Sequence, residues 1–256
     1  MSPRCCSSIL ASSSSAALLA LALLAFPAFA QRDGFKPPVG PVPRMADGKP
    51  DLSGVWDHPF VGDMTKSGPN QIGAGELPFT AWGLAEWKNY NAEDGDATGA
   101  CLPHGIVRSI NAPFPIQLVQ NNKYISFDFE TDNWFQVVPL DGRPHRKQIP
   151  TWAGDSVGHW EGDTLVIDTV NFNGRTKVDS IGHPQSDQLH VTQRWTRQDL
   201  GHMVVEITID DPKAYTKPWK NTRTFTLRPD WEIMEFSCEE NNKSLWEGRI
   251  KVPTTP

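Results

Sequence analysis

The sequence is poor in cysteine and has no cluster of basic residues. It holds four cysteines, and its 24 Lys and Arg residues are outnumbered by 30 Asp and Glu residues, for a net charge of −6. Proteins that bind nucleic acids or anionic membranes need a basic surface that can replace the counterions of their partner. We therefore expect neither nucleic acid nor a membrane surface as a partner.

Several enzyme signatures are also missing. The sequence contains no His-Glu-x-x-His zinc motif, no Gly-x-x-x-x-Gly-Lys phosphate loop and no Gly-x-Gly-x-x-Gly dinucleotide fingerprint. These absences disfavour zinc proteases and nucleotide-dependent enzymes. We expect no cofactor and no metal.

Long apolar runs are absent except near the N-terminus. Leu18 to Phe26 is apolar, Arg4 precedes it, and Ala28-Phe29-Ala30 follows with small residues at the positions that signal peptidase requires. The run is too short for a membrane anchor, which needs about 20 apolar residues. Lipoprotein processing is disfavoured because Cys5 and Cys6 precede the run. We predict that residues 1–30 are a signal peptide cleaved near Ala30, and that the protein is periplasmic or secreted.

Cleavage would remove 30 of 256 residues, leaving 226, and would remove two of the cysteines. This length suits a single β domain. Cys101 and Cys238 would remain, in a compartment where disulfides persist. We expect a bridge between them, the alternative being two buried free thiols.

Residues 31–50 are rich in proline, which favours extended geometry and cannot build a core. We expect them to form a tether or a surface strap, followed by one domain over 51–256. One helix is expected after Pro78, capped by Thr80, stapled by Phe79 and Leu84, and ending near Asn91.

From residue 115 onward, short segments with a period of two predominate. Met203, Val205, Ile207 and Ile209 alternate with polar residues, as in a sheet with one wet face. After a first strand at 52–56, we predict an all-β fold of about ten strands, an antiparallel lipocalin-like barrel, with a two-sheet sandwich as the alternative. The remaining predicted strands are 115–119, 123–129, 134–139, 156–160, 164–172, 188–197, 203–210, 222–227, 231–238 and 245–252.

Gly54-Val55-Trp56 resembles the Gly-x-Trp of lipocalins, whose first-strand tryptophan lies beneath a basic residue of the last strand. The resemblance implies a ligand-holding cup, with Arg249 as that basic residue.

A wider set of motifs resembles a large family of exported, mostly uncharacterised bacterial proteins. The resemblance covers nearly the whole chain after residue 50 and implies an exported β-barrel, without assigning catalytic residues. His104 stands where the family pattern has a second proline, so a family-wide role for it is not expected. The motifs are Asp51–Trp56, Cys101–Pro103, Asp141–His145, Trp160–Val166, Gly182–Pro184 and Cys238–Asn242.

The densest polar cluster runs from Asp168 to His190 and is expected at a barrel mouth, where loops concentrate binding residues. A histidine held by a carboxylate titrates near neutral pH and can transfer protons. We therefore predict catalytic roles for His183, His190 and Asp168, and substrate binding by Asn171 and Arg175. The alternatives are a solvated turn, or a metal site completed by Asp179 or Asp187.

Two further clusters are candidates. Asp211, Tyr215 and Trp219 lie in a proline-bounded loop, where Asp211 could take a proton and the two rings could stack on a ligand or merely cover a barrel end. Glu240 would continue the inward face of a strand over 231–238, where burial would favour a general acid. The competing interpretation is a solvated charge at a strand end.

Ten tryptophans are many for this length, and Trp134 is among those expected near an aromatic pocket. The leading hypothesis is an exported enzyme that performs cofactor-free acid–base chemistry, as a lyase, isomerase or hydratase, on a small aromatic or apolar molecule. The alternatives are a non-catalytic carrier of such a ligand and a carbohydrate-active lyase or hydrolase.

Overall fold

Antiparallel strands make up most of the computed structural model, which describes residues 34–94, 96–240 and 242–250. The strands are β1 (Gly54–Asp57), β2 (Gln71–Ile72), β3 (Ile116–Gln120), β4 (Tyr124–Phe129), β5 (Trp134–Pro139), β6 (Asp155–Glu161), β7 (Thr164–Val170), β8 (His190–Arg197), β9 (His202–Asp210) and β10 (Trp219–Leu227). The helical segments are α1 (Ala81–Lys88), η1 (Ala92–Asp94), α2 (Ile106–Asn111), η2 (Thr131–Asn133) and α3 (Lys243–Trp246).

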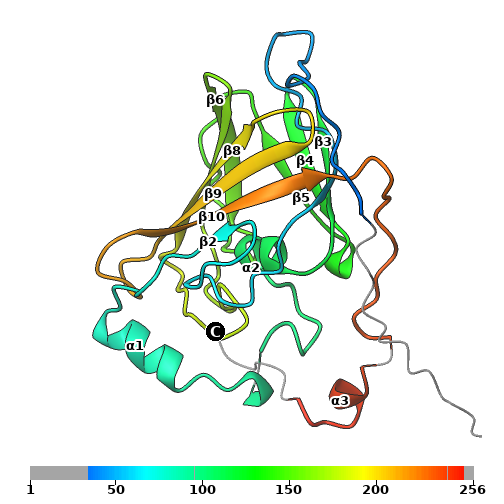
Figure 1. Ribbon diagram of the computed structural model, residues 1–256. Coiled ribbons are helices and arrows are strands. Elements are labelled where there is room, and N and C mark those ends of the chain that lie inside the picture. The colour runs from blue at the N-terminus through cyan, green and yellow to red at the C-terminus, as the bar shows by residue number, and fades with distance from the viewer. Residues whose placement is uncertain (1–33, 95, 241, 251–256) are drawn as a thin grey trace, which may run out of the picture. The chain divides into compact units, whose positions relative to one another are not determined.

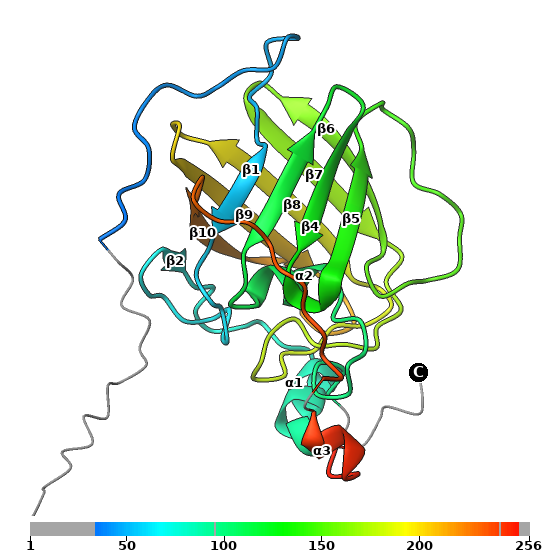
Figure 2. The ribbon, with the colours of Figure 1, turned by 90° about the vertical axis from the view of Figure 1, so that its right-hand side faces the viewer.

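Nine strands form one continuous antiparallel sheet in the order β5-β4-β3-β1-β10-β9-β8-β7-β6, with β2 added to β10. The sheet curls so that its two edge strands approach each other, giving a nearly closed barrel (Figures 1 and 2). Side chains close the seam: Gln136 of β5 donates to Ser156 of β6 at 2.5 Å. Gly158 leaves room there for Val138, whose Cγ1 would lie 3.0 Å from an added Cβ. The predicted barrel is confirmed.

Alternating side chains fill the barrel. On β9, Met203, Val205, Ile207 and Ile209 are buried, as their period of two predicts. Trp195 stands at the centre of an aromatic group, with ring centroids 4.9 Å from Phe127 and 5.3 Å from Phe225. The barrel interior around these rings is therefore a packed core.

A buried arginine connects this interior to one barrel end. Arg223 of β10 donates from Nε to Asn221 Oδ1 at 2.8 Å and from Nη1 to the Ile110 carbonyl of α2 at 3.0 Å. Burial lowers its pKa to about 9, and the negative charge of Asp179 partly opposes this effect. Polar contacts thus fix α2 across the end of the barrel.

The Gly-x-Trp segment has a cation above its ring, but not the one expected. Trp56 is fully buried, and the guanidinium of Arg197 from β8 lies 4.9 Å from its ring centroid. Arg197 also donates to the carbonyls of Asp51, Asp199 and Leu200. Arg249 is exposed and pairs with Glu247 at 2.6 Å, so its assignment as the partner of Trp56 was wrong.

Residues 37–50 run along the barrel surface beside the β8–β9 turn. Leu200 donates its N–H to the Gly40 carbonyl at 2.9 Å, and Arg44 pairs with Asp163 at 2.6 Å. Both contacts tie the segment to turns between strands.

The expected helix is confirmed as α1: Thr80 accepts a hydrogen bond from Gly83 N, although the helix ends at Lys88 rather than near Asn91. Helix α2 was not predicted. The expected strand over 231–238 does not form, and the strand expected over 245–252 is wrong in its described part, where α3 ends at Trp246. Residues 251–252 of that segment lie outside the described residues.

Cys101 and Cys238 form a disulfide with Cα atoms 5.5 Å apart, which confirms the bridge and excludes the free thiols. A disulfide is typical of an oxidising, exported location. Among the described residues, no helix is both long and apolar enough to cross a membrane. The predicted signal peptide, residues 1–30, lies outside the described residues.

Reduction of the disulfide should lower the free energy of unfolding by about 2–5 kcal/mol, because the bridge closes a long loop in the unfolded chain. Urea unfolding with and without dithiothreitol measures this loss. The doubly substituted Cys101→Ser, Cys238→Ser protein should be destabilised and insensitive to dithiothreitol. Equal stability of the oxidised and reduced wild type would contradict the expectation.

Arg197→Met should lower the free energy of unfolding by about 2–4 kcal/mol, because three carbonyl groups lose a buried donor. Arg194→Met is the matched control: Arg194 lies on the same strand, is 39% exposed and pairs with Glu161 at 2.9 Å. Its loss should cost at most about 1 kcal/mol. Urea unfolding measures the free energy of unfolding of both variants. Equal losses in the two variants would refute the stabilising role of Arg197.

Candidate functional site

The loop between β7 and β8 brings Asp179 and His183 together. Val178 N donates to the His183 carbonyl at 3.0 Å, so the chain turns back on itself between these residues. The turn needs glycine at 182, where φ is +83° and an added Cβ would lie 2.1 Å from the Tyr90 ring. A short, tightly packed turn therefore fixes the pair.

The two side chains form a buried hydrogen-bonded dyad. His183 Nδ1 lies 2.6 Å from Asp179 Oδ2, and His183 and Asp179 are 1% and 0% exposed. Asp179 also accepts the N–H of Met64 at 2.9 Å and the N–H of His183 at 3.2 Å. This set of donors compensates the burial of a carboxylate.

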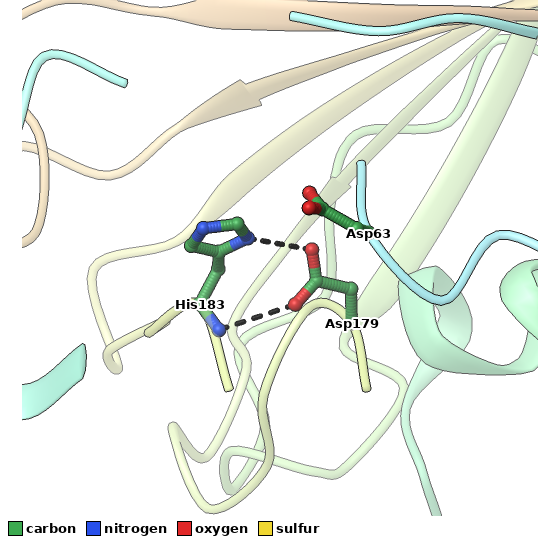
Figure 3. A group of neighbouring side chains, drawn as sticks. All are labelled: Asp63, Asp179 and His183. Carbon is green, nitrogen blue, oxygen red and sulfur yellow. Dashed lines mark hydrogen bonds and ion pairs between the residues drawn. The ribbon is translucent and has the colours of Figure 1, made fainter. Parts of the chain in front are cut away.

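A second carboxylate joins the dyad from the segment between β1 and β2. Asp63, Asp179 and His183 each present one potential ligand atom, all within 4.8 Å of one another (Figure 3). Asp63 Oδ1 accepts hydrogen bonds from N and Oγ1 of Thr65, at 2.8 and 2.6 Å. Among the described residues, no other group of three His, Cys, Asp or Glu side chains has such geometry.

A pocket of about 510 Å³, lined by apolar side chains together with several polar and charged ones, opens beside this group. The His183 ring lies 4.9 Å from the Trp87 ring and 6.0 Å from the Phe79 ring, measured between centroids. Helix α1 supplies Leu84 and Trp87 and is held in place by Gly83, which packs against the Ala214 carbonyl. The lining consists of Asp63, Thr65, Lys66, Gly75, Glu76, Leu77, Phe79, Leu84, Trp87, Ile181 and His183.

The second predicted cluster lies behind His183. Asp211 is buried and accepts from N and Oγ of Ser186 at 2.5 and 2.8 Å, and from the N–H groups of Lys213 and Ala214 at 3.2 Å each. Tyr215 donates to the Pro184 carbonyl at 2.8 Å. Burial, reinforced by the charges of Asp179 and Asp211, raises the pKa of Tyr215 far above its usual value. These contacts support the His183 loop.

Trp219 packs edge-to-face on Tyr215, with centroids 5.4 Å apart, and is 7% exposed. Neither ring is among the residues that line the pocket. Both rings therefore lie in the wall behind His183, and their stacking on a ligand stays a prediction.

Asp168 and His190 are brought together, but on the outer face of the sheet and with a histidine that had not been predicted. His145 Nε2 lies 2.7 Å from Asp168 Oδ2, His190 Nε2 bonds Asp168 Oδ1, and His145 Nδ1 lies 3.1 Å from Asp155. Arg146 Nε donates to Asp155 at 2.7 Å. We call Asp155, His145, Asp168 and His190 the outer cluster.

The outer cluster shifts the pKa values of its members. Partial burial lowers the pKa of His145, but the hydrogen bonds and charges of Asp168 and Asp155 outweigh this effect and raise it above 6.5. Burial raises the pKa values of Asp168 and Asp155, but their hydrogen bonds outweigh this effect, and both pKa values are lowered from 3.8. Asp168 is bonded to His190 and His145, and Asp155 is bonded to Arg146 and His145. The charged forms therefore stabilise one another.

The other predicted residues are dispersed. Asn171 donates to the Gln148 carbonyl at 3.0 Å, and the Arg175 guanidinium lies 5.1 Å from the Trp152 ring centroid. Trp134 lines a different pocket, of about 380 Å³, beside the disulfide. Glu240 is exposed in a turn, and the inward strand face that motivated its selection does not exist.

The pattern Gly-x-Ser-x-Gly, found at the nucleophile elbow of many serine hydrolases, occurs at 154–158. Here it lies within the antiparallel hairpin β6–β7 rather than at a strand-to-helix turn. Ser156 is buried at the barrel seam, 2.8 Å from the Thr169 hydroxyl. The serine is therefore a structural residue.

No protein-family model matches the chain, and no curated protein matches it at a significant level. The resemblance to a family of exported bacterial proteins stays an expectation, and function must be inferred from geometry.

Sequence reasoning missed Asp63 and His145 and considered Asp179 only as a metal ligand. Asp63 lies 116 and 120 residues from its two partners, so no local pattern connects them. His145 ends the Asp141–His145 motif. Its position in the sequence, shortly before Asp155 and Asp168, was the one signal that could have pointed to it. Asp179 was detectable from its spacing of four residues to His183.

His145→Asn should destabilise the fold mainly between about pH 4 and 6.5. Because the pKa of His145 is raised by folding, His145 stabilises the fold fully below pH 6.5, and this stabilisation is lost as the pH rises through its pKa in the folded state. Because the pKa values of Asp168 and Asp155 are lowered by folding, the two carboxylates stabilise the fold above pH 3.8, and this stabilisation is lost as the pH falls through their pKa values in the folded state. Because the groups are partly exposed, the loss should be about 1 kcal/mol or less.

Urea unfolding of this variant at about pH 5.5 and pH 9 measures the effect. His159→Asn is the matched control, since His159 is exposed on β6 and lies 3.3 Å from Glu161. An equal loss for His145→Asn at both pH values would show that the interaction with the carboxylates is not the cause.

Proposed function

We propose that this protein is an exported, periplasmic enzyme that binds a small aromatic or otherwise apolar molecule and performs acid–base chemistry on it, as a lyase, isomerase or hydratase. The observation that carries the proposal is the buried Asp179–His183 dyad beside a pocket to which Phe79, Leu84 and Trp87 contribute apolar surface. The disulfide supports the oxidising location.

The hydrogen bond to Asp179 orients the imidazole of His183. With the proton on Nδ1 donated to the carboxylate, Nε2 is left as a proton acceptor, and it makes no hydrogen bond to the described residues. When Nε2 takes a proton from the ligand, the negative charge of Asp179 stabilises the imidazolium that forms. The same proton can then be returned to another atom of the ligand, which completes an isomerisation or elimination.

The pocket suits an apolar ligand in size and lining. Its volume of about 510 Å³ falls within the range of about 300–1,000 Å³ of small-molecule sites. Phe79 and Trp87 present aromatic surface next to His183, and Leu77 and Leu84 extend it. The burial of both side chains also strengthens the electrostatic interaction within the dyad, because it keeps water away from them.

Carbohydrate-active chemistry receives less support. Asp63 and Asp179 present oxygens within 4.8 Å of each other, closer than the roughly 5–9.5 Å between the carboxyl groups of glycosidases. Asp179 is also fully buried. The carrier hypothesis shares the pocket and differs in predicting no proton transfer.

The proposal is tested with 5-nitrobenzisoxazole, an apolar aromatic compound that opens when a base removes its ring C–H proton. The proton would pass to His183 Nε2, the N–O bond would break, and a nitrile and a phenolate would form. We expect His183→Gln to lower kcat by about 10²- to 10⁴-fold, the usual contribution of a general base. Absorbance of the phenolate product measures the rate.

His202→Gln is the matched control, because His202 forms an exposed pair with Asp199 at 3.0 Å. Trp87→Ala tests the pocket separately and should raise KM more than it lowers kcat. Fluorescence quenching measures binding of the same compound. Binding without any rate difference between wild type and His183→Gln would favour a carrier and refute the acid–base role.

A further inference from the structure

Asp63 has no part in the proton transfer just described, although it lies beside the dyad. It contributes a third potential ligand atom within 4.8 Å of those of Asp179 and His183. We propose that these three side chains form a binding site for one divalent transition-metal ion (Figure 3).

The donor set determines the class of ion. One imidazole nitrogen with two carboxylate oxygens suits zinc, nickel, copper or iron, whereas calcium and magnesium prefer oxygen ligands alone. Three protein ligands also leave a coordination position open, as in catalytic zinc sites. Asp63 and His183 both line the pocket, so the open position would be accessible from it.

The ligands are already oriented by their surroundings. Met64 N and His183 N hold the Asp179 carboxylate, while the backbone and hydroxyl of Thr65 hold Asp63 Oδ1. Hydrogen bonds of this kind position metal ligands and raise metal affinity. The group therefore needs little rearrangement to accept an ion.

The charge balance also favours a cation. Asp63, which is partly exposed, and Asp179, which is buried, place two carboxylates close together, and like charges repel more strongly as burial reduces their screening by water. Arg223 offsets part of the charge of Asp179 from inside the barrel. A divalent ion would offset the remaining negative charge. Because the positive charge of Arg223 repels a cation, the affinity for the ion should be lower than that of a structural zinc site.

An ion at this site would change the dyad. The metal would take the place of the proton between Nδ1 of His183 and Asp179 Oδ2. Because a histidine ligand is a neutral imidazole, that proton would pass through solvent to Nε2, which could then no longer accept a proton from a ligand. Metal binding is independent of the proposed function, but the inhibition of proton transfer that follows from it rests on that function.

Zinc chloride titrated into tag-free, chelator-treated protein tests the proposal by isothermal titration calorimetry and native mass spectrometry. We expect one ion per chain, and at least tenfold weaker binding for Asp63→Asn, which keeps the hydrogen bond between Asp179 and His183. Asp187→Asn is the matched control, an exposed aspartate of the same loop, and should bind zinc as the wild type does.

Three results would overturn the proposal. One is a dissociation constant of the wild type for zinc above about 100 µM, which corresponds to a binding free energy of less than about 5.5 kcal/mol. Another is equal binding by the wild type and by Asp63→Asn. If His190→Asn abolished the binding instead, the ion would belong to the outer cluster and the proposal would be wrong.

The failure of this inference is distinguishable from failure of the proposed function. Loss of proton transfer in His183→Gln, without zinc binding by the wild type, would refute the metal site alone. Zinc binding that depends on Asp63, without proton transfer by the metal-free protein, would refute the acid–base role alone. If both proposals hold, zinc should suppress the ring opening of 5-nitrobenzisoxazole in wild type.

Discussion

The carboxylate of Asp179 must be satisfied by the protein because no part of it reaches solvent. Its hydrogen bonds come from the segment before β2 and from its own turn. The same turn is fixed to α2, where Arg108 donates to the Asp179 carbonyl and Asn111 to the Val178 carbonyl. Helix α2 in turn receives Arg223 from the barrel interior. Together, these contacts hold the turn, α2 and the segment before β2 around the buried carboxylate at the end of the barrel that carries the site.

The strands were predictable wherever alternation reflected pairing on both sides. Residues 203–210 lie between β8 and β10, so their period of two coincides with the inner and outer faces. Residues 231–238 alternate in a similar way, but their N–H groups at Met234 and Phe236 donate to side chains of Glu130 and Asn133. Helix α2 was missed because Ile106, Val107 and Ile110 are β-branched, and tertiary packing overrides that propensity.

Two of the three side chains of the candidate site were named from the sequence, and distance along the chain explains why the third was missed. His183 and Asp179 are four residues apart, and a single turn joins them. Asp63 reaches them only through the barrel topology. The register of β7 with β8 pairs Asp168 with Thr192, so His190 becomes a diagonal neighbour of Asp168 on the outer face. Without that register, Asp168, His183 and His190 looked like one cluster, whereas they belong to two.

The two histidine–carboxylate groups contain the same chemical types and differ in their surroundings. In the outer cluster, partial exposure of His145, Asp168 and His190 keeps the interaction screened by water, and the bridging histidine mainly secures the 141–154 segment against the sheet. At Asp179 and His183 water is excluded and one imidazole nitrogen is already committed to a carboxylate. A ligand entering the adjacent pocket would therefore meet a single oriented nitrogen, and this difference in solvation, rather than residue identity, makes the inner pair the better site for chemistry.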